Sequence, residues 1–402
     1  MSSNLELSQR VKALKPSPTL ATDAKAKTLK AQGVDIVNLS AGEPDFDTPT
    51  HIREAAKEAI DSGFTRYTPV GGIPELKAAI CMRLEQDYGL KYNETEVMVS
   101  TGGKQVLYNL AQAILDPGDE VIIPAPYWVS YPPIVELAGG VPVILPTEPS
   151  DNFAINIDKL ADLITSKTKA IILNSPSNPT GAIYDQETVK KIALLSVEKG
   201  IYIITDDIYD RIRFDGKEPY NCASLVPEAR QNCLIVNGVS KAYAMTGWRI
   251  GYLAGPENVV KACTKIQSQS TSNPTSVAQK AAVAALTGPQ DCVFEMQKAF
   301  KERCHAFVES LRNIPGISCP MPDGAFYCFP DMSAFYGKKT PEGNIIKGSL
   351  DLGDYLLEHA RVACIPGIAF GDDRCIRFSF ATDLQTLNKG LERIKNALEK
   401  LS

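Results

Sequence analysis

The sequence is poor in histidine and lacks any paired cysteine motif. Only three histidines, His51, His305 and His359, occur among the 402 residues, and none lies in an H-E-x-x-H or similar spacing. Without such ligands we expect no metal site. The ten cysteines are scattered from Cys81 to Cys375 with no C-x-x-C pair. Because a chain of this size folds without disulfides, we expect reduced thiols and a cytoplasmic location.

Long apolar runs and clustered basic residues are also missing. No segment reaches the roughly 20 apolar residues that a membrane-spanning helix needs. The first residues, Met1 to Pro16, include Glu6 and no apolar leader core. The formal net charge is -5, and no cluster of Lys and Arg offers a surface for nucleic-acid phosphates. We therefore expect no membrane insertion, no secretion and no nucleic-acid partner.

What the sequence does contain is an alternation of short apolar runs with helical patterns. Thr48-Pro49, a cap followed by proline, predicts the start of one amphipathic helix, and a second helix is predicted from Pro74 to near Gly89. Strands are predicted at 97–100, 121–124, 141–145, 170–174, 201–206, 234–240 and 249–254. Such alternation predicts a mostly parallel sheet covered by helices.

The pattern changes near Gly288. A long charged amphipathic helix, predicted for 291–312, leads into short strands and helices that continue to the end of the chain. A chain of this length also exceeds what one hydrophobic core usually serves. We predict an α/β fold with a large domain at 48–288, and a smaller α+β domain formed by 1–47 and 289–402.

Several predicted strands end in polar residues, among them Ser100, Asn174, Asp206 and Lys241. In an open α/β sheet, ligands bind outside the carboxyl ends of the strands, so these side chains are expected around one crevice. Gly102-Gly103 opens a helix whose amide groups suit a phosphate, although the pair taken alone is better explained by an ordinary turn. Since G-x-G-x-x-G and G-x-x-x-x-G-K-[ST] are both absent, a small phosphorylated cofactor is favoured over a dinucleotide or a nucleoside triphosphate.

Lys241 is a candidate nucleophile towards carbonyl groups. A lysine gains this reactivity when burial or neighbouring positive charge lowers its pKa. Lys241 follows an apolar strand, and Arg249 follows it by eight residues. A lysine taken alone is far more often a solvated surface charge, so the surrounding motifs must decide whether Lys241 is a nucleophile or a surface residue.

The segment Ser240–Tyr252, S-K-A-Y-A-M-T-G-W-R-I-G-Y, resembles the lysine signature of the class I/II aminotransferases, which are fold-type I pyridoxal phosphate enzymes. Further motifs of that family follow one another along nearly the whole chain. They are A-G-E-P-D-F at 41–46, Y-T-P at 67–69, G-G-K at 102–104, P-Y-W at 126–128, N-P-T-G at 178–181, D-D-I-Y at 206–209 and R-F-S at 377–379. Within the family the chain is most similar to the bacterial-type aspartate aminotransferases, including members that accept prephenate.

The resemblance implies that pyridoxal 5'-phosphate is bound to Lys241 through a Schiff base, and that Lys241 also carries the proton during transfer. Asp206 would hold the protonated pyridine nitrogen, since the cofactor needs an acidic partner there. Tyr209 and Asn178 would bind its phenolic oxygen, and Trp128 would stack on its ring. Catalytic roles are thus expected for Lys241, Asp206 and Tyr209.

The same resemblance implies which residues bind the cofactor phosphate and which residue a second subunit contributes. The phosphate would lie among Gly102, Gly103, Lys104, Ser240 and Arg249. Tyr67 would reach it from a second subunit, which implies a homodimer with shared active sites.

For the substrate, the resemblance implies that Arg377 binds the carboxylate, which suits the planar fork of arginine. Gly42 leaves room beside it, and Trp128 and Asn178 also contact the substrate. The segment 264–286 lacks the arginine that animal-type enzymes take from the partner subunit, whereas Lys104 and Thr19 match the bacterial-type site for the distal carboxylate. We expect ping-pong transfer from aspartate or glutamate to 2-oxoglutarate or oxaloacetate, with prephenate as an alternative acceptor.

Two other functions use the same motifs. A pyridoxal phosphate-dependent carbon-sulfur β-lyase shares the fold and the cofactor, and the motifs separate it poorly from a transferase. A cofactor-binding regulator would need an attached DNA-binding module, for which the residues before Asp47 leave no room.

Overall fold

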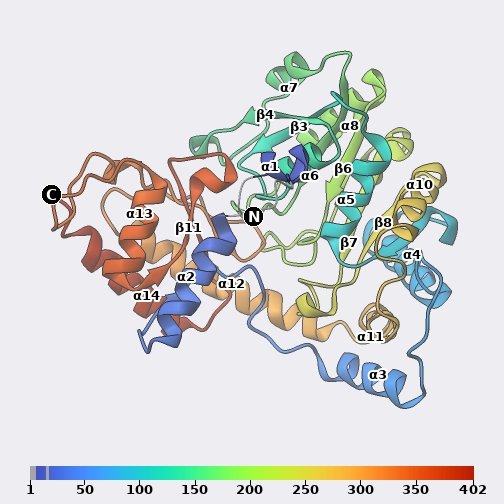
Figure 1. Cartoon of the computed structure of the whole chain (residues 1–402), viewed down its shortest axis with the longest axis horizontal. Coiled ribbons are helices and arrows are strands. Elements are labelled where there is room, and N and C mark those ends of the chain that lie inside the picture. Colours follow the sequence, from blue (N-terminus) through green and yellow to red (C-terminus); the bar gives the residue numbers. More distant parts are fainter. Residues whose placement is uncertain (1–5, 15–17) are drawn as a thin grey trace.

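The computed structural model describes residues 6–14 and 18–402, and it describes residues 18–23 by their backbone only. A large sheet flanked by helices forms one side of the molecule in Figure 1, and short strands and helices form a smaller unit on the other side. The long helix α12 (Asp291–Arg312) runs between the two. None of the helices in the described part of the chain is both long and apolar enough to cross a membrane.

Strands and helices alternate through the middle of the chain. The helices are α1 Gln9–Ala13, α2 Pro18–Ala31, α3 Thr50–Asp61, α4 Pro74–Tyr88, α5 Gly103–Ile114, α6 Tyr131–Leu137, α7 Ile157–Leu163, α8 Gln186–Lys199, α9 Cys222–Leu225, α10 Glu257–Ser268, α11 Ser276–Thr287, α12 Asp291–Arg312, α13 Ser349–Tyr355 and α14 Leu384–Leu398. The strands are β1 Val37–Asn38, β2 Val97–Ser100, β3 Glu120–Ala125, β4 Val141–Pro146, β5 Thr168–Asn174, β6 Tyr202–Asp206, β7 Cys233–Gly238, β8 Gly251–Ala254, β9 Tyr327–Cys328, β10 Val362–Ala363, β11 Ile365–Pro366 and β12 Ile376–Ser379.

The central sheet has seven strands in the order β2-β8-β7-β6-β5-β3-β4. Neighbouring strands are parallel except at β8, which runs antiparallel to both β2 and β7. This confirms the predicted mostly parallel sheet, and each of the seven predicted strands lies within two residues of an observed strand at either end. Every residue of β2, β7 and β8 is buried, as expected for strands covered by helices on both faces.

The predicted helices also agree with the structure, with one correction at a helix start. Helix α4 begins with Pro74 and is capped after Tyr88 by Gly89, whose φ of 70° is the left-handed conformation that favours glycine. Thr48 was expected to cap α3, but Pro49 occupies the cap position and no side chain bonds there. The hydroxyl of Thr48 instead donates to the carbonyl of Ala244 over 2.7 Å, so this residue ties the chain to the turn after β7.

The buried residues form separate cores for the sheet and for the smaller unit. Residues of the segment before Asp47, here called the N-terminal strip, pack with the C-terminal segment in the core of the smaller unit. Val37 is buried there with Ile394, and β1 pairs in parallel with β10. Helix α12 belongs to both cores. Its residue Val293 packs against the sheet unit, while Phe307 is buried in the smaller unit.

Candidate active site

A cavity of about 460 Å³ lies at the carboxyl ends of the central strands. Eleven of the residues predicted to bind the cofactor or the substrate line it. They are Gly42, Gly103, Lys104, Trp128, Asn178, Asp206, Tyr209, Ser240, Lys241, Arg249 and Arg377. The expected crevice therefore exists, and it collects side chains from segments far apart in the sequence.

The antiparallel strand β8 explains how Arg249 joins this edge of the sheet. The first residue of β8, Gly251, is paired with Ser100 on one side and Gly238 on the other, and these are the last residues of β2 and β7. A Cβ atom on Gly251 would lie 2.3 Å from the backbone nitrogen of Gly103. Glycine at this position thus lets the start of α5 approach the sheet and brings Arg249 next to the α5 N-terminus.

Arg249 and the first turn of α5 form one side of the cavity, and Gly102 lies against Arg249. Gly102 has a φ of 86°, and a Cβ atom there would lie 2.3 Å from Nη2 of Arg249. Nη1 of Arg249 donates to the carbonyl of Thr246 over 2.9 Å, which fixes the guanidinium. The first turn of a helix leaves backbone N–H groups without helical partners, and the dipole is positive there. Together with the guanidinium, this arrangement suits a phosphate group.

Lys241 lies on the turn that follows β7, and its side chain is half-buried in the cavity wall. Its amine donates a short hydrogen bond to the carbonyl of Gly42. Nζ is 5.9 Å from the ring centroid of Tyr209 and 5.7 Å from that of Phe326. The amine is thus held inside the cavity, beside two neighbouring aromatic rings.

Burial lowers the pKa of Lys241 to about 8. Among the nearby charges, Glu43 and Asp206 oppose this shift, while Arg377 and Arg249 add to it. An amine with this pKa is partly neutral near physiological pH, and the neutral form is the nucleophile towards a carbonyl group.

Asp206 is the last residue of β6 and is buried. The hydroxyl of Tyr131 donates to its Oδ2 over 2.6 Å, and the side-chain amide of Asn174 donates to its backbone carbonyl over 2.8 Å. Burial raises the pKa of Asp206 to about 6, and the bond from Tyr131 acts in the opposite direction. Asp206 is therefore an anion above about pH 6, able to pair with a positively charged N–H group.

Arg377 on β12 is a buried cation. It donates from Nη1 to Oδ1 of Asn178 over 3.0 Å and from Nη2 to the carbonyl of Ser40 over 2.8 Å. Its guanidinium carbon lies 4.4 Å from the ring centroid of Tyr327. Among the side chains that the structure describes, those of 6–14 and 24–402, no carboxylate forms an ion pair with Arg377, and its Nε is buried without a hydrogen-bond partner. A buried charge of this kind calls for an anionic ligand.

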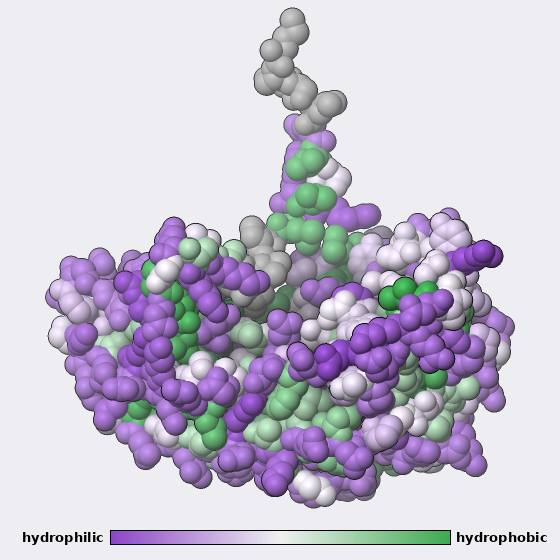
Figure 2. Space-filling model, turned by 90° about the horizontal axis from the view of Figure 1, so that it is seen from below, coloured by the Kyte–Doolittle hydropathy of each residue, from purple (hydrophilic) through white to green (hydrophobic). Residues whose placement is uncertain are grey.

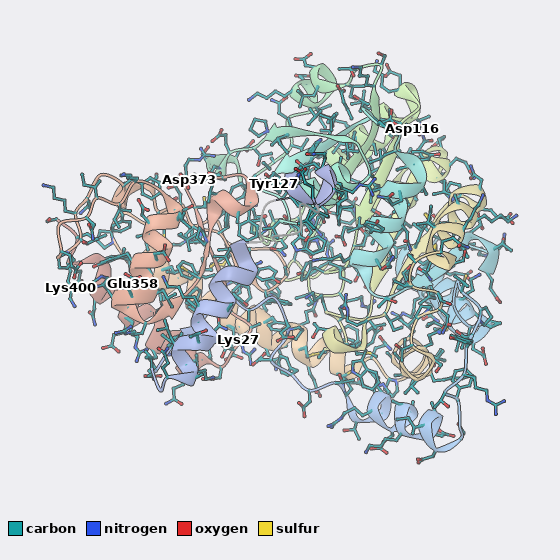
Figure 3. All side chains as sticks on the ribbon, viewed as in Figure 1. Lys27, Asp116, Tyr127, Glu358, Asp373 and Lys400 are labelled. Carbon is teal, nitrogen blue, oxygen red and sulfur yellow. The ribbon has the colours of Figure 1, made fainter. Side chains whose placement is uncertain are left out.

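Lys104 and Trp128 lie together at another part of the cavity wall. Nζ of Lys104 is 5.0 Å from the ring centroid of Trp128, and the same ring meets Tyr131 edge-on with centroids 5.4 Å apart. Desolvation and, after it, the charge of Arg249 lower the pKa of Lys104. The neighbouring Tyr127, marked in Figure 3, lies where the two units meet, and its N–H donates to the carbonyl of Phe370 over 3.0 Å.

Three predicted residues do not line the cavity in the described structure. Gly102 instead lies against the guanidinium of Arg249. Tyr67 is 93% exposed, on the loop between α3 and α4. Thr19 is in the first turn of α2, and its side chain lies outside the described residues.

Two tyrosines of the cavity were missed by the sequence analysis. Tyr131 is the first residue of α6 and lies three positions after Trp128, so only its closeness to the P-Y-W motif could have drawn attention to it. Tyr327 belongs to the two-residue strand β9, and its hydroxyl lies 3.0 Å from that of Tyr209. No sequence motif marks Tyr327.

Comparison with known families and proteins gives one consistent result. The profile of the family described as "Aminotransferase class I and II" matches residues 34–394. Aspartate aminotransferase of Geobacillus stearothermophilus is 47% identical over 398 residues, covering 98% of this chain and 99% of the relative. Aspartate/prephenate aminotransferase of Nitrosomonas europaea is 48% identical over 397 residues, covering 98% of this chain and all of the relative.

Solved structures are similarly close. Aspartate aminotransferase from Rhizobium meliloti is 44% identical and superimposes with a TM-score of 0.96, covering 99% of this chain and 100% of the other. Aspartate aminotransferase from Thermus thermophilus with maleate is 43% identical, with a TM-score of 0.91, covering 98% and 100%.

Proposed function

This chain belongs to the class I and II aminotransferases, and from that membership we propose that it transfers the amino group of aspartate or glutamate to a 2-keto acid, using pyridoxal 5'-phosphate. The transfer would follow a ping-pong course, in which the first product leaves before the second substrate binds. The keto acids are 2-oxoglutarate and oxaloacetate, with prephenate as a further candidate because several relatives are named for it.

The observation that carries the proposal is the position of Lys241, an amine of lowered pKa inside a cavity that also holds a carboxylate and a buried guanidinium. The cofactor fits this set of groups, since its aldehyde, ring nitrogen and phosphate each meet a residue of suitable chemistry. When bound, it supplies an electron sink for the carbanion of the substrate. Lys241 would bind the aldehyde carbon and later move a proton at Nζ, while Asp206 would hold the N–H of the ring.

The remaining cofactor contacts follow from the same geometry. Tyr209 and Asn178 would donate to the phenolic oxygen, and Trp128 would cover one ring face. The first turn of α5, Ser240 and Arg249 would bind the phosphate.

Arg377 would bind the carboxylate next to the amino group of the substrate, because it is buried and has no carboxylate partner in the described part of the chain. Asn178 accepts from the same guanidinium and would orient it. Gly42 and Trp128 would flank the substrate. Lys104, with the side chain of Thr19, would bind the distal carboxylate. Maleate, named with the Thermus structure, is a dicarboxylate, which supports an acidic substrate.

A homodimer completes this proposal, because Tyr67 would reach the phosphate bound by a second subunit. Its exposure of 93% leaves it open to such a contact. The segment that projects from the body in Figure 2 also carries apolar side chains, and Leu7 and Val11 beside and within α1 are exposed.

The proposal also includes two domains and a cytoplasmic location. The division into a large domain at 48–288 and a smaller one from 1–47 and 289–402 is supported by the separate cores. A cytoplasmic location is supported by the ten cysteines, all of them free thiols.

A single-substrate assay tests the function. The purified holoenzyme is mixed with one amino acid at a time, and the cofactor absorbance is followed as the aldehyde form converts to the aminated form. Aspartate and glutamate should convert it, whereas alanine should convert it far more slowly and the Lys241→Ala protein should not respond. Conversion by alanine or aromatic amino acids but not by aspartate or glutamate would contradict the proposed substrate. Release of pyruvate from cystathionine without a keto acid would instead favour the β-lyase.

A further inference from the structure

The loop from Phe64 to Ile73 joins α3 to α4 and carries Tyr67 near its middle. Tyr67 is the most exposed of the large apolar side chains in the described structure, at 93%. Exposed loops that carry such a residue are commonly mobile. This loop is instead fastened to the protein on both sides of Tyr67.

The residue that makes most of the contacts holding this loop is Gln279, a fully buried residue of α11. Its Nε2 donates to Oγ1 of Thr68 and to the carbonyl of Pro274, each over 2.9 Å. Its Oε1 accepts from the backbone N–H of Ile73 over 2.8 Å. A buried amide with three such bonds resists displacement, because each broken bond leaves an unsatisfied polar group.

The same face of α11 holds the two ends of the loop. Oγ of Ser276 donates to the carbonyl of Phe64 over 3.0 Å, and Nζ of Lys280 pairs with Glu75 over 2.9 Å. Since residues three and four positions apart share a helix face, Ser276, Gln279 and Lys280 form one continuous contact surface.

A second buried glutamine holds the loop from α10 and connects it to the α5 side of the cavity. Nε2 of Gln267 donates to the carbonyl of Val70 over 2.7 Å, while its Oε1 accepts from Oγ of Ser100 over 2.6 Å. Gln267 therefore touches both the loop and the strand that leads to Gly102. Gln279 differs, because the contacts described for it are confined to the loop, Pro274 and α11, and it does not line the cavity.

We propose that Gln279 is a positioning residue that acts on the active site of the partner subunit, by holding Thr68 and so fixing Tyr67 where a second copy of this chain receives it. This inference rests on the proposed function, in which Tyr67 reaches the phosphate across the dimer. Its physical basis is preorganisation: a loop fixed before assembly loses little conformational entropy when its tyrosine binds.

Two variants remove the fastening and one serves as a matched control. Gln279→Leu deletes the amide, and Thr68→Val deletes only the hydroxyl that it bonds, on a half-buried loop residue whose change leaves the core intact. Gln290→Leu is the control, because Gln290 also donates two bonds and accepts one but lies beyond the end of α11, away from the loop. Both test variants should weaken pyridoxal phosphate binding to the apoprotein about tenfold, while the control should bind it normally.

Mixed dimers separate an effect on the partner from a local one. Gln279→Leu and Lys241→Ala protomers carry different affinity tags, so that only dimers with one of each are purified. The Lys241→Ala protomer then supplies an intact loop to the one working site. The mixed dimer should have about half the activity of the normal dimer, together with normal cofactor affinity at that site. A mixed dimer as impaired as Gln279→Leu itself would overturn the inference.

A parallel pairing keeps this result distinct from the proposed function. Tyr67→Phe is combined with Lys241→Ala in the same way. Recovery with Tyr67→Phe but not with Gln279→Leu would overturn the role of Gln279 alone, whereas failure of recovery with both would overturn the shared active site as well.

Discussion

The hydroxyl of Tyr131 donates to Oδ2 of Asp206 over 2.6 Å, and both side chains are buried. Burial raises the pKa of Tyr131 well above its usual value, so the Tyr131 hydroxyl remains a hydrogen-bond donor at every pH at which the protein is folded. Because this bond favours the charged carboxylate, it opposes the effect of burial on Asp206. Tyr131 therefore widens the pH range in which Asp206 is an anion.

Replacement of Tyr131 by phenylalanine should raise the pKa of Asp206 from about 6 by about one unit, because a bond to a charged group is lost. Asp206 must be ionised in the proposed reaction, so activity falls as pH drops through its pKa. The acid limb of kcat/KM against pH should shift upwards, and cofactor affinity should fall more at pH 6.5 than at pH 8.5. Tyr355→Phe removes a comparable buried bond, 2.7 Å to Ala397, and should leave the acid limb in place.

Lys241 should destabilise the apoprotein at neutral pH. Its pKa of about 8 in the folded chain lies below the usual 10.5, so the unfolded chain binds the proton more tightly. Stability therefore rises with pH between these two values, and the deficit is greatest below pH 8. Lys241→Met should raise the unfolding free energy of the apoprotein by about 1 kcal/mol at pH 7, after allowance for its partial exposure. Thermal unfolding at pH 7 and pH 10 measures this, and an equal gain at both pH values would refute it.

Gly102→Ala should damage both the fold and the phosphate side of the cavity. Alanine is strained at a φ of 86°, and its Cβ would collide with the guanidinium of Arg249. We expect a loss of about 2 kcal/mol in urea unfolding together with weaker cofactor binding. Gly89→Ala is the matched control, since Gly89 has a φ of 70° with nothing within 4 Å of its Cβ. It should lose stability without losing affinity for the cofactor.

Lys104→Met tests the acidic substrate. Removal of the distal cation should reduce kcat/KM for aspartate about tenfold, which corresponds to one weakened charge contact. The value for alanine, which has no distal carboxylate, should change little. An equal loss for both substrates would place Lys104 on the cofactor phosphate, and its contact with Trp128 would then serve only to hold it there.

Much of the fold was predictable because strong local patterns coincide with burial. Helix α12 has the predicted bounds, since its apolar stripe is bounded by polar residues at both ends. The reversed direction of β8 was not predictable, because a short buried strand has the same composition in either direction. The role of Thr48 was missed for a related reason. A hydroxyl next to the start of a helix usually caps that helix. Only the tertiary packing brings the carbonyl of Ala244 within reach of the Thr48 hydroxyl.

The candidate site was predictable where chemistry is concentrated in motifs. Lys241, Asp206 and Arg249 lie in such segments and meet at the cavity. Tyr131 and Gln279 lie outside them, because their importance depends on which polar group each one meets in three dimensions. An isolated tyrosine or glutamine gives no sign of this in the sequence.

The pairing of Val37 with Val362 has a consequence for synthesis of the protein. The N-terminal strip is made first, yet its β-partner leaves the ribosome about 325 residues later. At usual translation speeds that delay is roughly 16 to 65 s, during which the sheet unit can fold around its own core. Leu39 is fully buried in the folded protein, but throughout this time it lacks the C-terminal residues that pack against it. The nascent chain thus keeps Val37 and Leu39 without their C-terminal neighbours until almost the whole protein has been synthesised.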